Sequence, residues 1–266
     1  MALIIDGRKL AREKEKALAQ KSTRPLKLVS FLVGENEASM RFLALKQRAA
    51  QRVGIGFELI KLPDLGGLAD LIRQKNVDAS VQGILVQLPL PGSLEVLDLI
   101  APSKDVDCLG KENLSLLAVG KPRFLPAVVE AIMEIVDFAK YPLAGTKTAV
   151  VGQGRLVGLP LSQHLRNLEA QVLVADEYTQ DLPALTKQAD ILVTASGVPN
   201  LIKREMVKPG ALVIDVGSPQ PEVDFEEVKK VAGAITPVPG GVGPLTVVSL
   251  LENVFTAANY AIIKHH

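Results

Sequence analysis

The sequence predicts an α/β protein of two domains, each with helices packed on a parallel sheet. A chain of 266 residues, 48% of them hydrophobic, can bury a sizeable core in one large domain or two ordinary ones. Short apolar runs rich in β-branched residues alternate with amphipathic segments through about the first hundred residues, which is the βαβ pattern. A second series starts at T-A-V-V-G, residues 148–152, where a strand runs into a glycine-rich turn.

The first series is expected to supply three helices and three strands. The helical segments have apolar residues at helical spacing and lie at residues 8–20, 37–52 and about 67–76. The strands are continuous apolar runs, as in a sheet covered on both faces, and lie at residues 26–33, 57–62 and 83–88.

The second series begins after a boundary expected within residues 120–145, where G-K-P-R-F-L-P leads into a helix. Its strands are expected at residues 148–152, 172–175, 190–195 and 211–217, with helices at about 157–168 and 245–263. Between the last strand and the last helix, residues 234–246 read A-I-T-P-V-P-G-G-V-G-P-L-T. Proline fixes φ and glycine lets the main chain approach a neighbour, so this rigid loop suits a wall for a flat ligand. By composition alone, an ordinary turn is an equally good interpretation.

Composition points to a small-molecule ligand. With 30 Lys plus Arg against 29 Asp plus Glu, and no basic run, we expect no nucleic-acid partner. No apolar run approaches the ~18 residues of a membrane span, so we expect no membrane partner and a cytoplasmic location. Cys108 is the only cysteine, in agreement with a reducing compartment. His265 and His266 end the chain, are typical of a purification tag, and are left out of any metal-site hypothesis.

Three motifs together resemble the bifunctional methylenetetrahydrofolate dehydrogenase/cyclohydrolase family. They are the 234–246 loop, G-I-L-V-Q-L-P-L-P at 83–91 and P-S-K-D-V-D at 102–107, and the resemblance runs from I-D-G-R at 5–8 to the final helix. It implies a folate-binding catalytic domain (residues 1–125 plus 245–266), a Rossmann-like dinucleotide-binding domain (residues 126–244) and a cleft between them. It also implies oxidation of 5,10-methylenetetrahydrofolate to the methenyl form, hydrolysis to 10-formyltetrahydrofolate, and a homodimer joined through the Rossmann-like domains. The pathway implied is one-carbon metabolism and purine biosynthesis.

The predicted cofactor site begins at Gly152, Gly154 and Gly158, spaced G-x-G-x-x-x-G. A strand that ends in glycines lets a pyrophosphate reach N–H groups at a helix N-terminus, although a plain tight turn is the alternative. With the family's contacts added, the cofactor-binding residues are predicted to be Gly152, Gln153, Gly154, Arg155, Val157, Gly158, Asp176, Ser196, Gly197, Val216 and Thr246.

The cofactor is predicted to be NAD, with NADP as the alternative. Asp176 follows the second strand at the distance where a carboxylate accepts from a ribose 2′-hydroxyl. Asp176 and Glu177 stand where the family usually has a His-Ser pair, and two carboxylates would repel a 2′-phosphate. Arg155 is the candidate phosphate receptor, and a solvated turn is the other interpretation of the two acids.

The predicted catalytic residues are Lys46, Gln87 and Asp107, and no metal is expected. S-M-R-F-L-A-L-K resembles the family's Ser-x-x-Tyr-x-x-x-Lys, which makes Ser39, Phe42 and Lys46 one face of a helix. The resemblance assigns proton transfer to Lys46, contact with Lys46 and substrate to Gln87, and the pterin's paired donors to Asp107. The predicted substrate-binding residues are Ser39, Phe42, Pro239, Gly240 and Gly241.

Departures from the family leave two alternatives open. Phe42 keeps a ring for stacking but lacks the tyrosine hydroxyl, so one alternative is a dehydrogenase with impaired cyclohydrolase activity. The cofactor side is also altered, for example at P-A-V-V (residues 126–129), so the other alternative is a silent folate- or nucleotide-binding homologue. Cys108 replaces the usual glycine after Asp107, and Asp105 is predicted to cap its loop.

Overall fold

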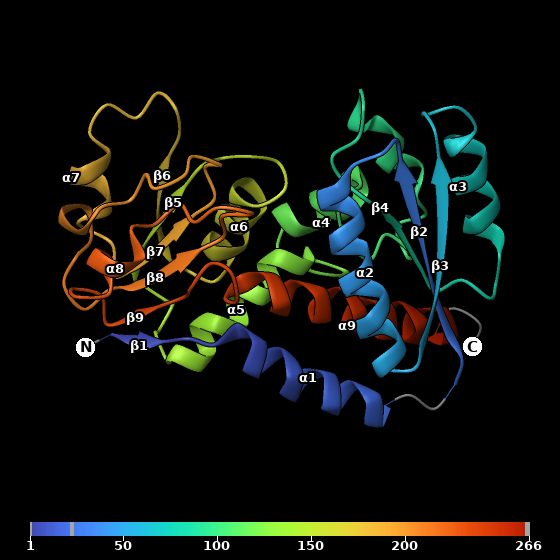
Figure 1. Cartoon of the computed structure of the whole chain (residues 1–266), viewed down its shortest axis with the longest axis horizontal. Coiled ribbons are helices and arrows are strands. Elements are labelled where there is room, and N and C mark those ends of the chain that lie inside the picture. Colours follow the sequence, from blue (N-terminus) through green and yellow to red (C-terminus); the bar gives the residue numbers. More distant parts are fainter. Residues whose placement is uncertain (1, 22–23, 264–266) are drawn as a thin grey trace. The chain divides into compact units, whose positions relative to one another are not determined.

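The computed structural model describes residues 2–21 and 24–263 (Figure 1), so His265 and His266 lie outside the described residues. The described chain divides into two compact units. The six-stranded unit contains residues up to 11, 118–120 and 128–246. The three-stranded unit contains residues 12–117, 121–127 and those from 247 onward. Helices α1 (Gly7–Lys21), α5 (Ala127–Ala139) and α9 (Val242–Ile263) contribute residues to both.

The three-stranded unit is built on a parallel sheet in the order β3-β2-β4. Its strands are β2 (Leu26–Val33), β3 (Ile55–Leu62) and β4 (Gly83–Val86). Its other elements are α2 (Glu37–Arg52), α3 (Leu68–Val77), η1 (Leu94–Leu99) and most of α4 (Lys111–Ala118). The chain leaves β2 for β3 on one side and returns to β4 on the other, so a topological switch point lies at the carboxyl ends of β2 and β4.

The core of this unit explains why β2 is an almost unbroken apolar run. Seven of its eight residues are buried, because β2 is the central strand and is covered on both faces. One face packs under α3 and η1, in a cluster that includes Val29, Phe31, Ile72 and Leu97. Helix α2 packs against β3.

The six-stranded unit has a parallel sheet in the order β1-β9-β8-β7-β5-β6. Its strands are β1 (Leu3–Ile4), β5 (Lys147–Val151), β6 (Gln171–Ala175), β7 (Ile191–Thr194), β8 (Leu212–Asp215) and β9 (Ala234–Ile235). Its remaining helices are α6 (Gly158–Asn167), α7 (Leu182–Thr186), η2 (Arg204–Met206) and α8 (Phe225–Val228). Strands β6 and β7 flank β5, so the switch point of this sheet lies at the carboxyl ends of β5 and β7.

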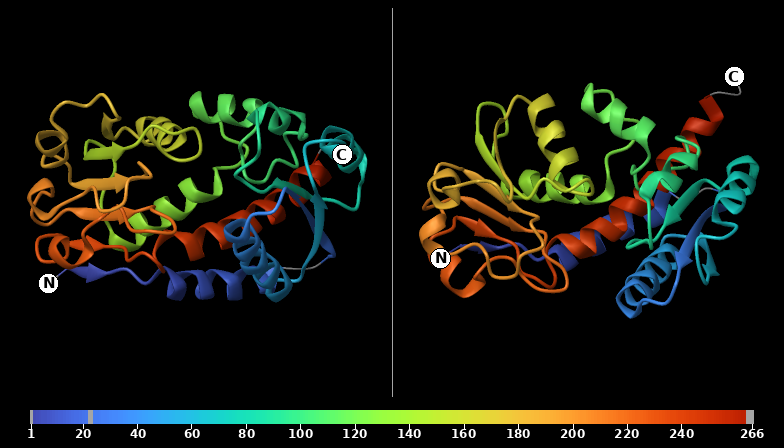
Figure 2. Two further views of the ribbon diagram at one scale, coloured as in Figure 1. Left: turned by 45° about the horizontal axis from the view of Figure 1, so that its top comes forward. Right: turned by 90° about the horizontal axis from the view of Figure 1, so that it is seen from above.

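Helices cover this sheet, as the three views in Figures 1 and 2 show. Helix α6 packs against β5 and β6. Another buried cluster joins side chains of the strands, such as Val151 and Val213, to Met206 of η2 and Val228 of α8. The predicted two-domain α/β class with parallel sheets is therefore confirmed.

Several predicted boundaries were wrong in detail. Strand β4 ends at Val86, so Gln87 lies just beyond the strand and not inside it. The 234–246 segment is a loop only in its middle, because it begins with β9 and its last residues form the first turn of α9. Two-residue strands such as β1 and β9 have no readable alternation, and neither was predicted. Because β1 pairs with β9, the residues up to 11 belong to the six-stranded unit. The functional division stays a prediction: a folate-binding domain of residues 1–125 plus 245–266, and a dinucleotide-binding domain of residues 126–244.

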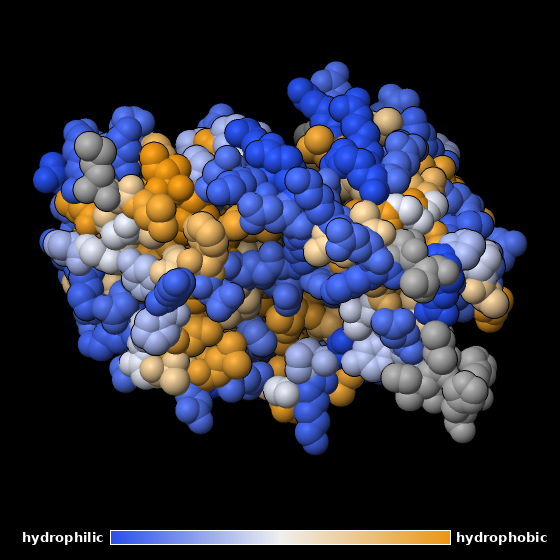
Figure 3. Space-filling model, turned by 90° about the horizontal axis from the view of Figure 1, so that it is seen from below, coloured by the Kyte–Doolittle hydropathy of each residue, from blue (hydrophilic) through white to orange (hydrophobic). Residues whose placement is uncertain are grey.

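Apolar side chains also reach the surface, and Figure 3 shows hydrophobic residues among hydrophilic ones on one face. Among the large exposed ones are Leu3 and Ile4 of β1 and Val174 of β6, which are the two edge strands of their sheet. Within the described residues, none of the helices combines the length and the apolar character needed to cross a bilayer.

Candidate functional site

Helix α2 starts beside the switch point of the three-stranded sheet and presents three of the predicted site residues. The Asn36 side chain caps the helix by accepting from the Ser39 N–H at 2.9 Å. The Ser39 hydroxyl donates to the Leu88 carbonyl at 3.2 Å, which ties the helix to the segment after β4. Phe42 lies one turn further along and is partly buried, and Lys46 follows on the next turn.

Lys46 and Gln87 are in direct contact. Lys46 Nζ donates to Gln87 Oε1 at 3.0 Å, and the Lys46 side chain is buried, with 8% of the residue exposed. The Gln87 amide Nε2 donates to the Leu88 carbonyl at 2.8 Å, so both ends of the amide are engaged. The Gln87 backbone N–H continues the sheet by donating to the Phe31 carbonyl at 2.8 Å. The predicted amine and amide therefore meet at the carboxyl edge of the sheet.

Asp107 is close enough to Lys46 for the two charges to interact. Burial lowers the pKa of the Lys46 ammonium, and the negative charge of Asp107 opposes that shift only in part. Burial likewise raises the pKa of the Asp107 carboxyl, against the smaller opposing effect of Lys46. Loss of water thus decides the direction of both shifts. Both groups are moved toward their neutral forms, which eases proton exchange with a bound molecule.

The loop that carries Asp107 is fixed by the buried carboxylate of Asp105. Asp105 accepts from the backbone N–H groups of Leu109 at 3.2 Å and Gly110 at 2.9 Å. The predicted capping role of Asp105 is confirmed. The segment also runs beside β4, since Ile84 N–H donates to the Lys104 carbonyl at 2.8 Å.

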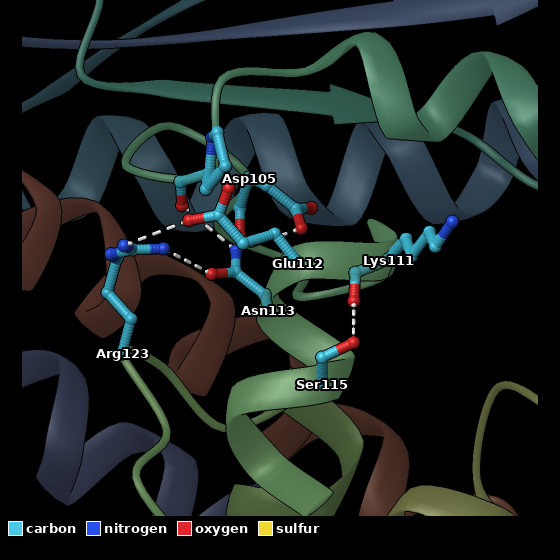
Figure 4. A network of polar contacts seen from close by, with 7 residues as sticks. Asp105, Lys111, Glu112, Asn113, Ser115 and Arg123 are labelled. Carbon is cyan, nitrogen blue, oxygen red and sulfur yellow. Dashed lines mark hydrogen bonds and ion pairs between the residues drawn. The ribbon is translucent and has the colours of Figure 1, made fainter.

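A polar network extends from Asp105 to Arg123 (Figure 4). Asn113 Nδ2 donates to Asp105 Oδ2 at 3.0 Å, and Asn113 Oδ1 accepts from Arg123 Nη1 at 2.7 Å. Arg123 Nη2 also donates to Glu112 Oε1 at 3.3 Å. Burial raises the pKa of Asp105 despite the hydrogen bonds that favour its charged form. The network orients the Asp105 carboxylate and thereby the loop that follows it.

Cys108 has a backbone conformation that favours glycine. Its φ of 57° lies in the left-handed region, which is unfavourable for residues other than glycine because their Cβ crowds the backbone. Its thiol is buried and donates to the Phe124 carbonyl at 3.3 Å. Burial strongly raises the pKa of this thiol, so Cys108 is a packed side chain and not a nucleophile.

The glycine-rich turn of the six-stranded unit lies at its own switch point. Gly152 has φ 93°, and a Cβ there would stand 2.3 Å from the Ala195 carbonyl oxygen. A Cβ on Gly158 would stand 1.8 Å from the Gly152 carbonyl oxygen. Both glycines are therefore required by close backbone packing. Gly154, by contrast, is exposed and has open space where a side chain would be.

Helix α6 begins immediately after this turn. Its N-cap, Val157, has no side chain that can accept from the first N–H groups. Those groups and the helix dipole suit an anionic ligand. The Gln153 side chain bonds to neighbouring groups of the protein: its Nε2 donates to the Gly152 carbonyl at 3.1 Å and to Ser162 Oγ at 3.4 Å. Arg155 is partly buried beside the open Gly154.

Asp176 follows β6 and is exposed. Its Oδ1 accepts from the Tyr178 N–H at 3.0 Å and from the Thr179 hydroxyl at 3.3 Å. Glu177 is also exposed. The two acids thus stand on an ordered turn at the end of the second strand.

The remaining predicted residues also belong to the six-stranded unit. Ser196 and Gly197 follow β7, and Val216 follows β8, with its N–H donated to the Thr194 carbonyl at 3.0 Å. Gly240 has φ 116°, and the Arg8 guanidinium donates to the Pro239 carbonyl at 3.5 Å. A Cβ on Gly7 would stand 1.8 Å from the Gly241 carbonyl oxygen, so I-D-G-R packs directly on this loop. Thr246 Oγ1 donates within α9 to the Val242 carbonyl at 3.1 Å.

Comparison with known proteins identifies the family. Residues 126–262 match the model of the tetrahydrofolate dehydrogenase/cyclohydrolase NAD(P)-binding domain, and residues 5–107 match that of the catalytic domain. The chain belongs to the tetrahydrofolate dehydrogenase/cyclohydrolase family. The predicted family is confirmed.

Relatives in this family match over nearly their whole length. Bifunctional protein FolD of Exiguobacterium sibiricum is 43% identical, with 97% of this chain and 100% of that protein covered. The crystal structure of the bifunctional enzyme FolD from Campylobacter jejuni has a TM-score of 0.93 at 37% identity, covering 98% and 100% of the two chains. The Trypanosoma brucei dehydrogenase-cyclohydrolase, crystallised with NADP and an inhibitor, has a TM-score of 0.92 at 33% identity and covers 98% of each chain.

Within the family fold, the predicted residues fall into two groups. In the first group, the Ser39 hydroxyl and the Gln87 amide both donate to the Leu88 carbonyl. Lys46 donates to Gln87, and the charge of Asp107 acts on Lys46. In the predicted cofactor site, Gly152 packs on the backbone of Ala195 and Ser196, and Gly158 packs on Gly152. Sequence reasoning missed Asn113, Arg123, Asn253 and Glu222. Asn253 of α9, for instance, donates to the carbonyls of Val106 at 2.8 Å and Leu125 at 2.9 Å. An asparagine in an apolar helix was the available signal, because a buried amide needs partners.

Proposed function

We propose that this chain oxidises 5,10-methylenetetrahydrofolate to the methenyl form and hydrolyses that product to 10-formyltetrahydrofolate. The contact between Lys46 and Gln87, beside Asp107 at a sheet switch point, carries the proposal. A nicotinamide dinucleotide, when bound, accepts the hydride released in the oxidation. The activity belongs to one-carbon metabolism, and purine biosynthesis is an expected consumer of the product.

In the hydrolytic step, Lys46 handles the proton. Burial lowers the pKa of its ammonium, which makes proton release less costly than in water. Gln87 holds the amine in place through Oε1 and is itself fixed by the Leu88 carbonyl. Lys46 can then orient the attacking water near the one-carbon unit and exchange a proton with a folate nitrogen.

Asp107 binds the pterin ring in this proposal. The pterin presents an amino group and a ring N–H as two parallel donors, which a single carboxylate accepts together. The Asp105 network fixes the direction of the loop that carries this carboxylate. Ser39 and Phe42 provide a wall of the folate site, and Phe42 stacks on the ring. Pro239, Gly240 and Gly241 stay predicted substrate-binding residues, and they form a loop with few side chains.

Phe42 favours one alternative function, a dehydrogenase with weak cyclohydrolase activity. Hydride transfer depends on alignment of the substrate, whereas hydrolysis depends on proton handling next to Lys46. The absent hydroxyl therefore affects the second step more than the first. Decay of the methenyl absorbance after its formation separates the bifunctional enzyme from this alternative.

The nucleotide is proposed to bind along Gly152, Gly154 and the N-terminus of α6. The open space at Gly154 and the N-cap without a polar side chain support a pyrophosphate at this position. We propose NAD as the preferred cofactor, because Asp176 and Glu177 repel a 2′-phosphate. A higher kcat/KM with NADP would refute this preference and assign the phosphate to Arg155.

The chain is further proposed to form a homodimer through its nucleotide-binding unit. An edge strand of that unit, β6, carries the exposed Val174, and the turn after it carries the exposed Tyr178. Exposed apolar side chains on an edge strand are suited to association with a second copy. Light scattering coupled to gel filtration measures the mass directly, and a monomer at micromolar concentration contradicts the proposal. A cytoplasmic location is proposed from the single, buried, free cysteine, Cys108.

A further inference from the structure

Glu222 is a buried carboxylate with no role in the steps above. It lies on the loop after β8, and only 3% of the residue is exposed. Its Oε2 accepts from the Ser196 N–H at 2.8 Å and from the Ser196 hydroxyl at 2.6 Å, and its Oε1 accepts from the Gly197 N–H at 2.7 Å. The Thr194 hydroxyl also donates to Oε2. All four donors come from the end of β7 and the loop after it.

Glu222 is itself held by a second buried acid, Asp215, at the end of β8. Asp215 Oδ2 accepts from the N–H groups of Glu222 at 2.9 Å and Val223 at 3.0 Å, and Oδ1 accepts from the Gly217 N–H at 2.8 Å. These bonds fold the loop back on the strand end. The Glu222 carboxylate is thereby directed at the end of β7.

The loop that Glu222 holds is in contact with the glycine-rich turn. A Cβ on Gly152 would stand 2.3 Å from the Ala195 carbonyl oxygen and 2.8 Å from Ser196 Cα. Backbone packed this closely cannot shift independently. The position of residues 195–197 therefore sets the position of the turn where the pyrophosphate is proposed to bind.

The hydrogen bonds to Glu222 also decide which groups this loop offers to a ligand. They use the N–H groups of Ser196 and Gly197 and the hydroxyl proton of Ser196. The Val198 N–H is engaged as well, since it donates to Ser196 Oγ at 3.1 Å. The backbone polar groups left on Ser196 and Gly197 are their carbonyl oxygens, which can only accept, and the Glu222 carboxylate lies behind them. Such a surface suits ligand donors and disfavours a phosphate.

We infer that Glu222 is a positioning residue that fixes residues 194–197 as an acceptor surface for the hydroxyl and amide donors of the nucleotide's ribose and nicotinamide. The inference rests on the proposed function for the identity of the nucleotide. Glu222 does not touch the nucleotide; it acts through Ser196 and Gly197.

The test is the pair E222Q and E205Q. Glutamine keeps the shape of Glu222 but replaces one acceptor oxygen with an NH₂ group, which faces donors in the loop. We expect the calorimetric Kd for NAD to rise about tenfold in E222Q, equivalent to ~1.4 kcal/mol. Glu205 is an exposed glutamate of η2 in the same unit, and E205Q should bind NAD like the parent.

Two further readouts separate positioning from a general loss of structure. Methenyl hydrolysis involves no nucleotide and should stay within about twofold of the parent in E222Q, against the tenfold loss in binding. Hydrogen exchange should quicken in the segment 194–198 and stay unchanged in β5. An unchanged Kd for NAD in folded E222Q overturns the inference.

If E222Q does not fold, Thr194→Val supplies the second variant. It removes one donor to Glu222 while leaving the carboxylate, and should raise the Kd for NAD about threefold, or ~0.65 kcal/mol. An unchanged Kd in this variant then overturns the inference. A parent protein that binds NAD but turns over no folate would refute the proposed function. The role of Glu222 would still be tested by comparing the Kd for NAD of E222Q with that of the parent.

Discussion

The substitution Lys46→Met tests the proposed role of Lys46 in proton transfer. Methionine preserves the length and much of the apolar stem of the side chain but removes the amine that donates to Gln87 Oε1 at 3.0 Å. A positioned group that transfers a proton typically accelerates a reaction by about 10²- to 10⁴-fold. The variant should therefore lose methenyl hydrolysis by that factor, or about 3 to 5 kcal/mol of activation free energy.

The same substitution has a defined effect on stability. Burial lowers the pKa of Lys46 in the folded protein below the ordinary value of 10.5, so the unfolded state binds more protons between the two values. The free energy of unfolding of the parent consequently rises with pH across that window. Below the window, the parent bears the full cost of a buried ammonium, which the methionine variant lacks. We expect the variant to lack the pH-dependent rise in the free energy of unfolding that the parent shows below pH 10.5.

The assay follows decay of the methenyl absorbance, with unfolding by denaturant measured at two pH values on the same preparation. Arg48→Met is the matched control, because Arg48 is an exposed cation on the same helix and should leave hydrolysis unchanged. Undiminished hydrolysis by folded Lys46→Met would show that the lysine is not the proton-transfer group.

Three other predictions concern the same unit. Asp107→Ala should weaken folate binding by about 1.5 to 3 kcal/mol, the scale of a hydrogen bond to a charged group, and leave nucleotide affinity unchanged; equal folate affinity by calorimetry would remove Asp107 from the site. Phe42→Tyr should raise the ratio of cyclohydrolase to dehydrogenase activity by about tenfold, equivalent to one hydrogen bond of ~1.4 kcal/mol formed in the transition state. A ratio unchanged within one preparation would mean that the missing hydroxyl is compensated elsewhere. The Cys108 thiol, buried and with a raised pKa, should react with a thiol reagent only after denaturation; rapid labelling of the native protein would contradict its packing.

The sequence predicted the elements that have long, regular patterns. Helix α2 and strand β2 lie at the predicted residues, because sixteen residues at helical spacing and eight consecutive mostly apolar residues each leave a clear period. The glycine turn was equally readable, since Gly152 and Gly158 are required by backbone contacts that a Cβ would block.

Contacts between distant loops could not be predicted in the same way. Glu222 lies in P-E-V-D-F, for which the sequence predicted no role, and its partner Ser196 is 26 residues earlier and follows another strand. The two loops come together because β7 and β8 are neighbours in the sheet, and the pairing of strands leaves no signal in the periodicity of either strand. Arg123 was missed because it lies in the irregular segment after α4, where no periodic pattern indicates its contact with Asn113, ten residues earlier in that helix.

The most direct test of the central claim is one continuous recording of the methenyl absorbance. The purified protein is supplied with 5,10-methylenetetrahydrofolate and either NAD or NADP. The account predicts that the absorbance rises, faster with NAD, and then decays faster than the uncatalysed hydrolysis measured without protein. If no methenyl compound forms with either nucleotide, and added methenyltetrahydrofolate decays only at the uncatalysed rate, the proposed bifunctional activity is contradicted.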